Sequence, residues 1–440
     1  MIIRFIVLIL CSQFAFSVLA MKGVLLPQML SLWEISKTQF GILMSIYGTT
    51  HTILYLALAW VQDRYPSKVL IPINMILGGI TTFFLGGKLD FNTLCFLFLM
   101  LAIWCEGAFW PAILTAVRRS TNDDNQSKIF GLLEGGRGIV ELFQNAIALG
   151  LYTYFSYSTF GLEIAFKINA VFMIILGLIS WLVLPSHILL KSTQDQKLNR
   201  EVIEGIRLCL TIPQVWLAGS LGFFIYVIYT SLPFFITYLT DLYLVPMLAV
   251  SVFGILSTSG GRIGAALPSG FIAKHFFGGA AGAIKIALIF LGFVSALMVI
   301  ATSVKGAWWL VMPLLSLIIV TIFFMRALYF APFGEMGIPP RFSGSVIALA
   351  AFLIYLPSSF AYLAWGYLLD STHGDAGYQY LFFILAVTAS GGAFLAHKLA
   401  ASTRHGVKTK IRAKVDHLDE RLSLTGEEQS FDRVTSKRQN

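Results

Sequence analysis

Long apolar runs alternate with short polar gaps along nearly the whole chain. Twelve of these runs reach the roughly 20 residues that a helix needs to cross the hydrocarbon layer of a bilayer. They cover residues 3–25, 39–61, 69–87, 92–117, 129–153, 164–185, 212–238, 247–273, 282–303, 307–332, 343–368 and 378–399. The pattern predicts an all-α membrane protein with twelve transmembrane helices.

The longest internal polar stretch separates the sixth run from the seventh. It extends from about residue 186 to residue 207 and is rich in charged side chains. We therefore expect two pseudo-symmetric six-helix bundles, at 1–186 and 211–400, joined by a cytoplasmic linker at 187–210. Residues 401–440 form a polar tail whose one anchoring aromatic residue is Phe431. A segment with so few apolar side chains is expected to be disordered.

The distribution of lysine and arginine predicts the orientation in the membrane. With both termini in the cytoplasm, fourteen basic residues before the tail fall on the inner side and four on the outer side, as the positive-inside rule requires. A cleaved signal peptide ending near Ala20 is an alternative for the first run. Its removal would break the six-plus-six pattern, so a membrane span is favoured.

Composition excludes a soluble globular enzyme. Hydrophobic residues make up 57% of the chain and charged residues 12%, roughly half the charged share of a soluble domain. The net charge of +9 does not indicate nucleic acid binding, because nine of the 31 basic residues lie after residue 400 and most others lie between apolar runs. The sequence has no P-loop, zinc-protease or nucleophile-elbow motif, and its four cysteines lack metal-ligand spacing. No cofactor, metal or catalytic residue is therefore expected.

The two halves share short sequence patterns that indicate an internal repeat. Residues 40–43 and 253–256 both read Phe-Gly-Ile-Leu. In the fourth run, Glu106 is followed by two aromatic residues at plus three and plus four and then by proline. The tenth run repeats this arrangement after Arg326. We expect Glu106 and Arg326 to face each other across a pseudo-twofold axis.

The loop between the second and third runs carries a family resemblance. Residues 59–68 resemble the signature of the major facilitator superfamily, with Asp63, Arg64 and Lys68 matching its charges. Residues 109–111, 129–138 and 326–337 are similar to a branch of bacterial inner-membrane facilitators near the sugar-phosphate and organic-anion carriers.

This resemblance implies a fold and a mechanism. In this superfamily the first, fourth, seventh and tenth spans and their neighbours surround a central cavity, which opens alternately to the two sides. The loop charges, here Asp63 and Arg64, stabilise one of the two states. The resemblance also implies a multi-pass protein of the bacterial inner membrane that transports a small solute.

Polar side chains recur along one face of the fifth run. Glu134, Arg137, Glu141, Gln144 and Asn145 are spaced so that all five share a helical face. An ionisable residue within a span is costly, so this stripe must face protein or water. A neutralised seam between helices is one interpretation, with Arg137 paired to Glu134 or Glu141. Binding of substrate or protons is the other.

Other ionisable residues are candidates for binding or gating. Arg262 in the eighth run is expected to pair with Glu134 or Glu141, either as a gate or as packing between the halves. Arg326 and Arg137 are suited to capture an anion, and Glu106 is suited to carry a coupling proton. A structural ion pair between Glu106 and Arg326 is the alternative.

Three further residues are candidates for contacting the solute or for shaping the cavity. Lys22 is predicted to lie in the last turns of the first span, where it can extend outward to the membrane surface or contact substrate. Trp110 can stack on a sugar ring. Pro233 is expected to interrupt the seventh span beside the cavity.

Together these features favour a secondary active transporter. The expected solute is small and polar, and the arginines favour an anion such as an acidic sugar, a sugar derivative or an organic acid, coupled to protons or to counter-exchange. A neutral-sugar or drug transporter and a transporter-derived sensor are the alternatives. The expected partners are the solute and the lipid bilayer, and the protein is expected to be a monomer.

Overall fold

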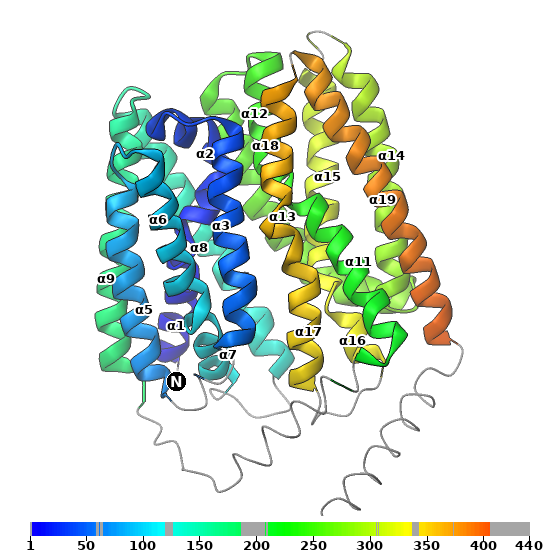
Figure 1. The fold of residues 1–440 in the computed structure, drawn as a ribbon, viewed down its shortest axis with the longest axis horizontal. Helices are drawn as coiled ribbons and strands as arrows, with labels where there is room; N and C mark the ends of the chain where they lie inside the picture. The colour runs from blue at the N-terminus through cyan, green and yellow to red at the C-terminus, as the bar shows by residue number, and fades with distance from the viewer. Residues whose placement is uncertain are drawn as a thin grey trace, which may run out of the picture.

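The computed structural model describes residues 2–58, 61, 65–118, 126–185, 207, 210–304, 306, 308–336, 343–372 and 374–404. All regular elements in these residues are helices (Figure 1). They are α1 (Ile2–Phe14), α2 (Ser17–Trp33), α3 (Lys37–Ala57), α5 (Ser67–Leu85), α6 (Phe91–Ala102), η1 (Ile103–Gly107), α7 (Phe109–Arg118), α8 (Gln126–Tyr154), α9 (Thr159–Val183), α11 (Pro213–Thr230), α12 (Leu232–Tyr243), α13 (Met247–Phe276), α14 (Ala280–Thr302), α15 (Trp308–Leu328), α16 (Ala331–Glu335), α17 (Ser343–Tyr355), η4 (Leu356–Ser359), α18 (Ala361–Ser371) and α19 (Asp375–Arg404).

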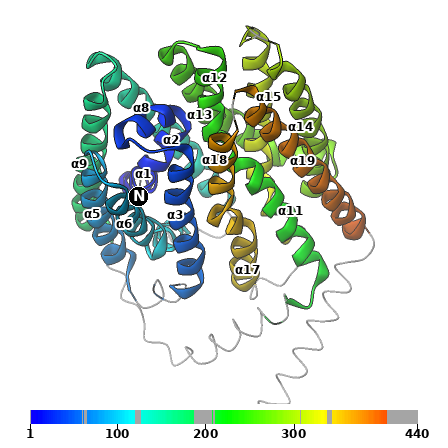
Figure 2. The ribbon, with the colours of Figure 1, turned by 45° about the horizontal axis from the view of Figure 1, so that its top comes forward.

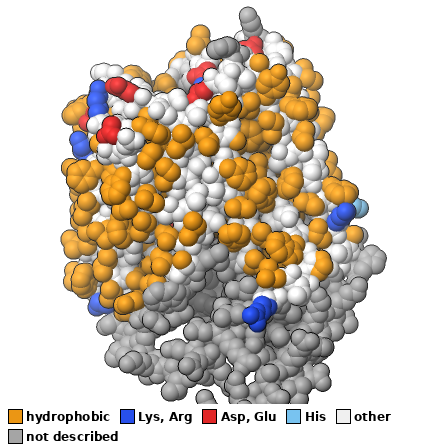
Figure 3. Space-filling view, viewed as in Figure 1, with side chains coloured by type: hydrophobic (Ala, Val, Ile, Leu, Met, Phe, Trp, Pro, Cys, Tyr) orange, Lys and Arg blue, Asp and Glu red, His pale blue; other side chains and the backbone are white. Residues whose placement is uncertain are grey.

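The prediction of an all-α membrane protein is confirmed. Within the described ranges, nine helical segments are long and apolar enough to cross a membrane, and the bent pair of α1 and α2 makes a tenth. The long helices α3 and α8 are outside this set, so the count of twelve stays a prediction. Figure 3 shows hydrophobic side chains covering most of one face, with charged side chains near its ends. Such a band suits contact with lipid.

Several helices are interrupted where they approach the centre of the molecule. The axes of α1 and α2 meet at 44°. The seventh span breaks at Ser231, and Pro233 stands at the start of α12, because proline is tolerated in a first turn but not inside a helix. The fourth span contains a π-helical turn, η1, between α6 and α7, a distortion that is frequent at functional sites.

Helices α1 to α9 lie on one side of the molecule and helices α11 to α19 on the other (Figures 1 and 2). The main contacts between the two groups join α3 to η4, α17 and α18, α2 to α12 and α13, and α8 to α13. The predicted boundaries at 186 and 211 stay a prediction, since most of the 187–210 linker and the tail beyond residue 404 are outside the described residues.

The backbones of the two groups are in close contact where α3 begins. A Cβ atom placed on Gly366 of α18 would lie 2.2 Å from the carbonyl oxygen of Lys37, and one on Gly41 would lie 2.6 Å from the backbone of Leu363. These distances are shorter than any side chain allows, so α3 and α18 pack backbone against backbone. This end of the molecule, called the Lys37 end below, is closed.

Candidate functional site

A cavity of about 970 Å³ lies between the two groups of helices. It is large enough for a small solute. Its wall combines aromatic and small apolar side chains with seven charged ones, which are Lys22, Glu106, Glu134, Arg137, Glu141, Arg262 and Arg326. With four cations and three carboxylates, the wall has a net charge of +1 when its histidine is neutral.

Four of these residues form an ionic cluster between α8 and α13. Arg262 lies 2.8 Å from a Glu134 oxygen and 2.5 Å from a Glu141 oxygen, and Arg137 lies 2.7 Å from the other oxygen of Glu134. The expected pairing of Arg262 with α8 is therefore confirmed as a contact. Two arginines and two glutamates neutralise one another here, while a role in gating stays a prediction.

Exposure along α8 shows where the cavity opens. The Glu134 side chain is 49% exposed, whereas the side chain of Glu141, two turns further along, is 10% exposed. The cavity is therefore open towards the beginning of α8, away from the Lys37 end. Deeper in the wall, Arg137 lies over the Trp110 ring, 4.6 Å from its centre, and over the Phe16 ring at 5.3 Å. The guanidinium of Arg137 is thus held by aromatic faces as well as by Glu134.

Arg326, in the last turn of α15, reaches the cavity from the opposite group of helices. Its guanidinium lies over the Tyr229 ring, 4.0 Å from the ring centre. Among the described residues, no carboxylate lies within ion-pair distance of Arg326. Glu106 and Arg326 line the same cavity, as expected, but the alternative of a structural ion pair between them is not found there. An arginine without an acidic partner is available to an anionic ligand.

Glu106 belongs to η1 and contacts two residues of α3. The Tyr47 hydroxyl donates to one carboxylate oxygen at 3.0 Å, and His51 Nε2 lies 3.6 Å from the other. Both α3 residues are one helical turn apart and are buried. Glu106 is therefore held on α3, within its own group of helices.

Lys22 is placed differently from the prediction. The helix that carries it continues to Trp33 instead of ending near residue 25, so Lys22 lies mid-helix and its side chain does not extend to the membrane surface. Its ammonium group is buried and donates to the Tyr362 hydroxyl at 2.8 Å. This bond joins α2 to α18 at the cavity wall.

Gln144 is also placed differently from the expected role in substrate binding. It is not part of the cavity wall. Its amide donates to Asn169 of α9 at 3.2 Å, inside the first group of helices. The polar stripe of α8 thus turns from the cavity to α9 after Glu141. Asp63 and Arg64, the expected gating charges, lie outside the described residues.

The sequence analysis assigned no binding role to several polar aromatic residues of the site. Tyrosines from α11, α17 and α18 and from the residues after α15 line the cavity near Arg326, and they are Tyr226, Tyr229, Tyr329, Tyr355 and Tyr362. Their hydroxyl groups can bind the hydroxyl or anionic groups of a solute. His51 was missed as well, although a histidine inside an apolar run is a signal that the sequence contains.

The arrangement of these side chains suits the binding of a polar solute. In the part of the chain that the structure describes, no three His, Cys, Asp or Glu residues gather as metal ligands would. The cavity wall contains Arg326, Lys22 and a set of tyrosines. It also contains Glu106 beside His51.

Comparison with protein families gives one match over most of the chain. The model of the Major Facilitator Superfamily matches residues 6–362. Two relatives from Escherichia coli (strain K12) are similar along most of their length. The inner membrane protein YihN is 26% identical over 423 residues, which cover 93% of this chain and 98% of the relative. The inner membrane protein YqcE is 23% identical over 363 residues, which cover 81% and 84%.

Solved transporter structures share the fold. A bacterial homolog of the human lysosomal transporter Spinster, inward-facing and occupied, gives a TM-score of 0.71 at 13% identity, covering 90% of this chain and 96% of that one. The nucleoside transporter NupG gives a TM-score of 0.69 at 14% identity, covering 90% and 98%. At these identities the likeness confirms the fold class and carries no information about the solute.

Proposed function

Because this chain belongs to the Major Facilitator Superfamily, and is therefore a transporter and not an enzyme, we propose that its solute is a small polar anion. The solute class includes acidic sugars, sugar derivatives and organic acids. Transport proceeds by alternating access across the bacterial inner membrane, coupled to protons or to counter-exchange. Both termini lie in the cytoplasm, so that the Lys37 end faces outward and the cavity opens inward.

The observation that carries this proposal is the position of Arg326. Its guanidinium lies in the cavity against Tyr229 with no acidic partner among the described residues. A charge held inside a membrane without a partner is costly. Such a cost is accepted where a ligand supplies the missing charge. Lys22, bonded to a neutral tyrosine hydroxyl, adds a second cation to the same cavity.

The side chains that line the cavity also favour particular chemical groups on the solute. Tyrosine hydroxyl groups near Arg326 favour a solute with several hydroxyl or carbonyl groups, which can accept and donate hydrogen bonds. Aromatic faces such as that of Trp110 can cover the less polar side of a sugar ring. The ionic cluster of Glu134, Arg137, Glu141 and Arg262 is neutral and lies between the halves, where it acts as a gate.

Thermal stabilisation and uptake test the proposal. Purified protein is heated with D-glucuronate, D-gluconate, a hexose phosphate, succinate, D-glucose or an organic cation, because a ligand that binds the folded state alone raises its stability. Any stabilising compound is then tested for uptake into proteoliposomes. Arg326→Gln and Arg326→Lys are measured alongside, since lysine keeps the charge but loses the bidentate geometry of arginine.

The outcomes separate the candidate solutes. Stabilisation by an anion that is lost in Arg326→Gln and partly kept in Arg326→Lys supports the proposal. Stabilisation by glucose or the organic cation alone overturns it in favour of a neutral-sugar or drug transporter. An anion that stabilises Arg326→Gln as well as it does the unmodified protein also overturns the assigned role of Arg326.

A further inference from the structure

We propose that His51 and Glu106 together form a proton-binding site and that occupation of this site by a proton promotes binding of the anion. This inference rests on the proposed function and goes beyond it, because it selects proton coupling over counter-exchange. It also names His51, a residue outside the motifs and charges that the sequence analysis singled out.

The geometry of the pair suits one shared proton. His51 Nε2 lies 3.6 Å from Glu106 Oε2, and both side chains are about one-tenth exposed. Histidine is the side chain whose charge changes most readily near neutral pH. A proton placed on this pair changes its total charge from −1 to zero, whichever of the two groups holds it. Tyr47, which donates to the other carboxylate oxygen, keeps the carboxylate oriented towards the imidazole.

The surroundings of the pair come from both groups of helices. The charged and titratable groups around it are Lys22 on α2, Tyr47 on α3, Cys105 on η1, Tyr226 on α11, Arg326 on α15 and Tyr355 on α17. Two of these are cations from opposite halves. These two cations, Lys22 and Arg326, are the ones that bind the solute in the proposed function.

A line of contacts leads from the pair towards the segment that carries Arg326. The His51 ring lies 5.1 Å from the Tyr355 ring on the opposite group of helices. The hydroxyl groups of Tyr355 and Tyr329 are 3.2 Å apart, and Tyr329 follows Arg326 by three residues. Protonation of His51 and Glu106 therefore changes the electrostatic potential near Arg326, on the opposite group of helices. The two groups separate along this interface in alternating access.

Charge explains why a proton promotes anion binding. With the pair unprotonated, the charged residues of the cavity and His51 sum to +1, and with the proton they sum to +2. A more positive cavity binds an anion more tightly, and by reciprocity the bound anion raises the affinity for the proton. A monoanion and one proton together return the cavity to its empty charge. The loaded protein can then change from one open state to the other without a new charge imbalance in the cavity.

Proton uptake on binding tests this inference. D-glucuronate is titrated calorimetrically into the purified full-length protein, in buffers of different ionisation enthalpy near neutral pH. We expect uptake of about one proton per anion and an affinity that rises up to about tenfold for each unit of pH decrease. His51→Gln and Glu106→Gln remove the proton uptake. Glu106→Gln, which resembles the protonated carboxyl group, keeps tight binding at all pH values, whereas loss of a merely structural residue would weaken it.

The matched controls are His275→Gln and Glu163→Gln. His275 lies at the end of α13, and Glu163 is paired with Lys167 on α9; both are outside the cavity wall. They are expected to leave the proton uptake unchanged. Binding of D-glucuronate without proton uptake, or uptake that both cavity variants retain, overturns the inference while the proposed function stands.

A second measurement does not depend on the ligand. Infrared difference spectra of the ligand-free protein are recorded on lowering the pH, to detect a protonated carboxyl band of Glu106 or an imidazolium band of His51. A band that is lost in Glu106→Gln and shifted in His51→Gln supports the proton site, even if no anion in the panel binds and the proposed function fails. The absence of both bands, or bands unchanged in both variants, overturns the proton site even if an anion is transported.

Discussion

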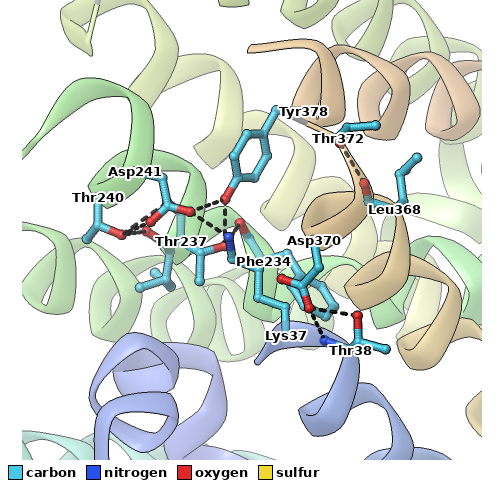
Figure 4. A network of polar contacts seen from close by, with 11 residues as sticks. Lys37, Thr38, Phe234, Thr237, Thr240, Asp241, Leu368, Asp370, Thr372 and Tyr378 are labelled. Carbon is cyan, nitrogen blue, oxygen red and sulfur yellow. Dashed lines mark hydrogen bonds and ion pairs between the residues drawn. The ribbon is translucent and has the colours of Figure 1, made fainter. Parts of the chain in front are cut away.

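Lys37 at the start of α3 and Asp241 near the end of α12 form an ion pair of 2.8 Å between the two groups of helices (Figure 4). Tyr378 of α19 donates to the same carboxylate oxygen at 2.8 Å. Beside this pair, the backbone N–H and the hydroxyl of Thr38 both donate to Asp370 of α18 at 2.6 Å. Two carboxylates of the second group thus hold the first turn of α3 and close the Lys37 end.

Removing the ion pair is expected to open the Lys37 end part of the time. The side chains of Lys37 and Asp241 are 20% and 41% exposed, so water screens the pair and its loss costs about 0.2–1 kcal/mol. Lys37→Met therefore shifts the ratio of closed to open protein by up to about fivefold. Double electron–electron resonance between spin labels at Glu34 and Leu244 measures this shift as a longer distance between the labels. Both residues are exposed at this end.

The control for this shift is Lys167→Met, which removes an ion pair within α9. Adding Asp241→Asn to Lys37→Met is expected to change the distance little further, because the partner is already lost. A distance distribution in Lys37→Met that matches the unmodified protein would show that the pair does not hold this end.

The ionic cluster at α8 and α13 predicts a larger effect on stability. Arg262→Met leaves Glu141 buried without its cation, and breaking a buried pair from one side costs about 3–5 kcal/mol. Adding Glu141→Gln is expected to recover part of that loss, since the uncompensated charge disappears. Unfolding followed by circular dichroism in detergent measures both variants. Equal stability of the single and double variants would indicate that Glu141 stays hydrated without Arg262.

Much of this cluster could be predicted from the sequence, because it depends on local spacing. Glu134, Arg137 and Glu141 share a face in any α-helix. The family resemblance placed the span that carries Arg262 beside them. The apolar runs likewise predict the helices, since a bilayer demands long apolar segments wherever they occur.

Contacts between distant segments could not be predicted in the same way. Lys22 lies mid-helix because α2 continues beyond the apolar run, and its partner Tyr362 is 340 residues away in the chain. Glu106, which His51 contacts, lies in the π-helical turn η1 of the fourth span. Neither helix continuation nor a π-helical turn has a clear signal in the pattern of apolar residues.

The bond between Lys22 and Tyr362 leads to a third prediction. Tyr362→Phe removes the acceptor of a buried ammonium group, which is expected to destabilise the ligand-free protein by about 1–3 kcal/mol. A bound anion then supplies the missing partner, so the stabilisation by anion becomes larger than in the unmodified protein. Thermal unfolding with and without a stabilising anion measures this difference. If the gain on adding the anion is the same in both proteins, Lys22 does not contact the solute.

The beginning of α6 predicts a dependence on pH outside the membrane. Hydrogen bonds from Thr93 lower the pKa of Asp90, which caps this helix. Because its pKa is lower in the folded than in the unfolded protein, Asp90 stabilises the fold above its unfolded pKa. That contribution is lost as the pH falls through the folded pKa. Asp90→Asn is therefore expected to melt earlier than the unmodified protein at neutral pH, and the two melting temperatures should converge in acid.

The close packing of α3 on α18 gives the sharpest test of how the Lys37 end closes. In Gly366→Ala the new methyl group would lie 2.2 Å from the carbonyl oxygen of Lys37, and overpacking of this kind costs about 1–3 kcal/mol. The open state has no such clash, so the spin-label distance between Glu34 and Leu244 should lengthen more than in Lys37→Met. Gly260→Ala is the matched control, because nothing lies within 4 Å of the methyl group that it adds to α13. Both variants gain the helix propensity of alanine, so a difference between them isolates the clash, and equal distances in the two would mean that α18 moves aside without opening this end.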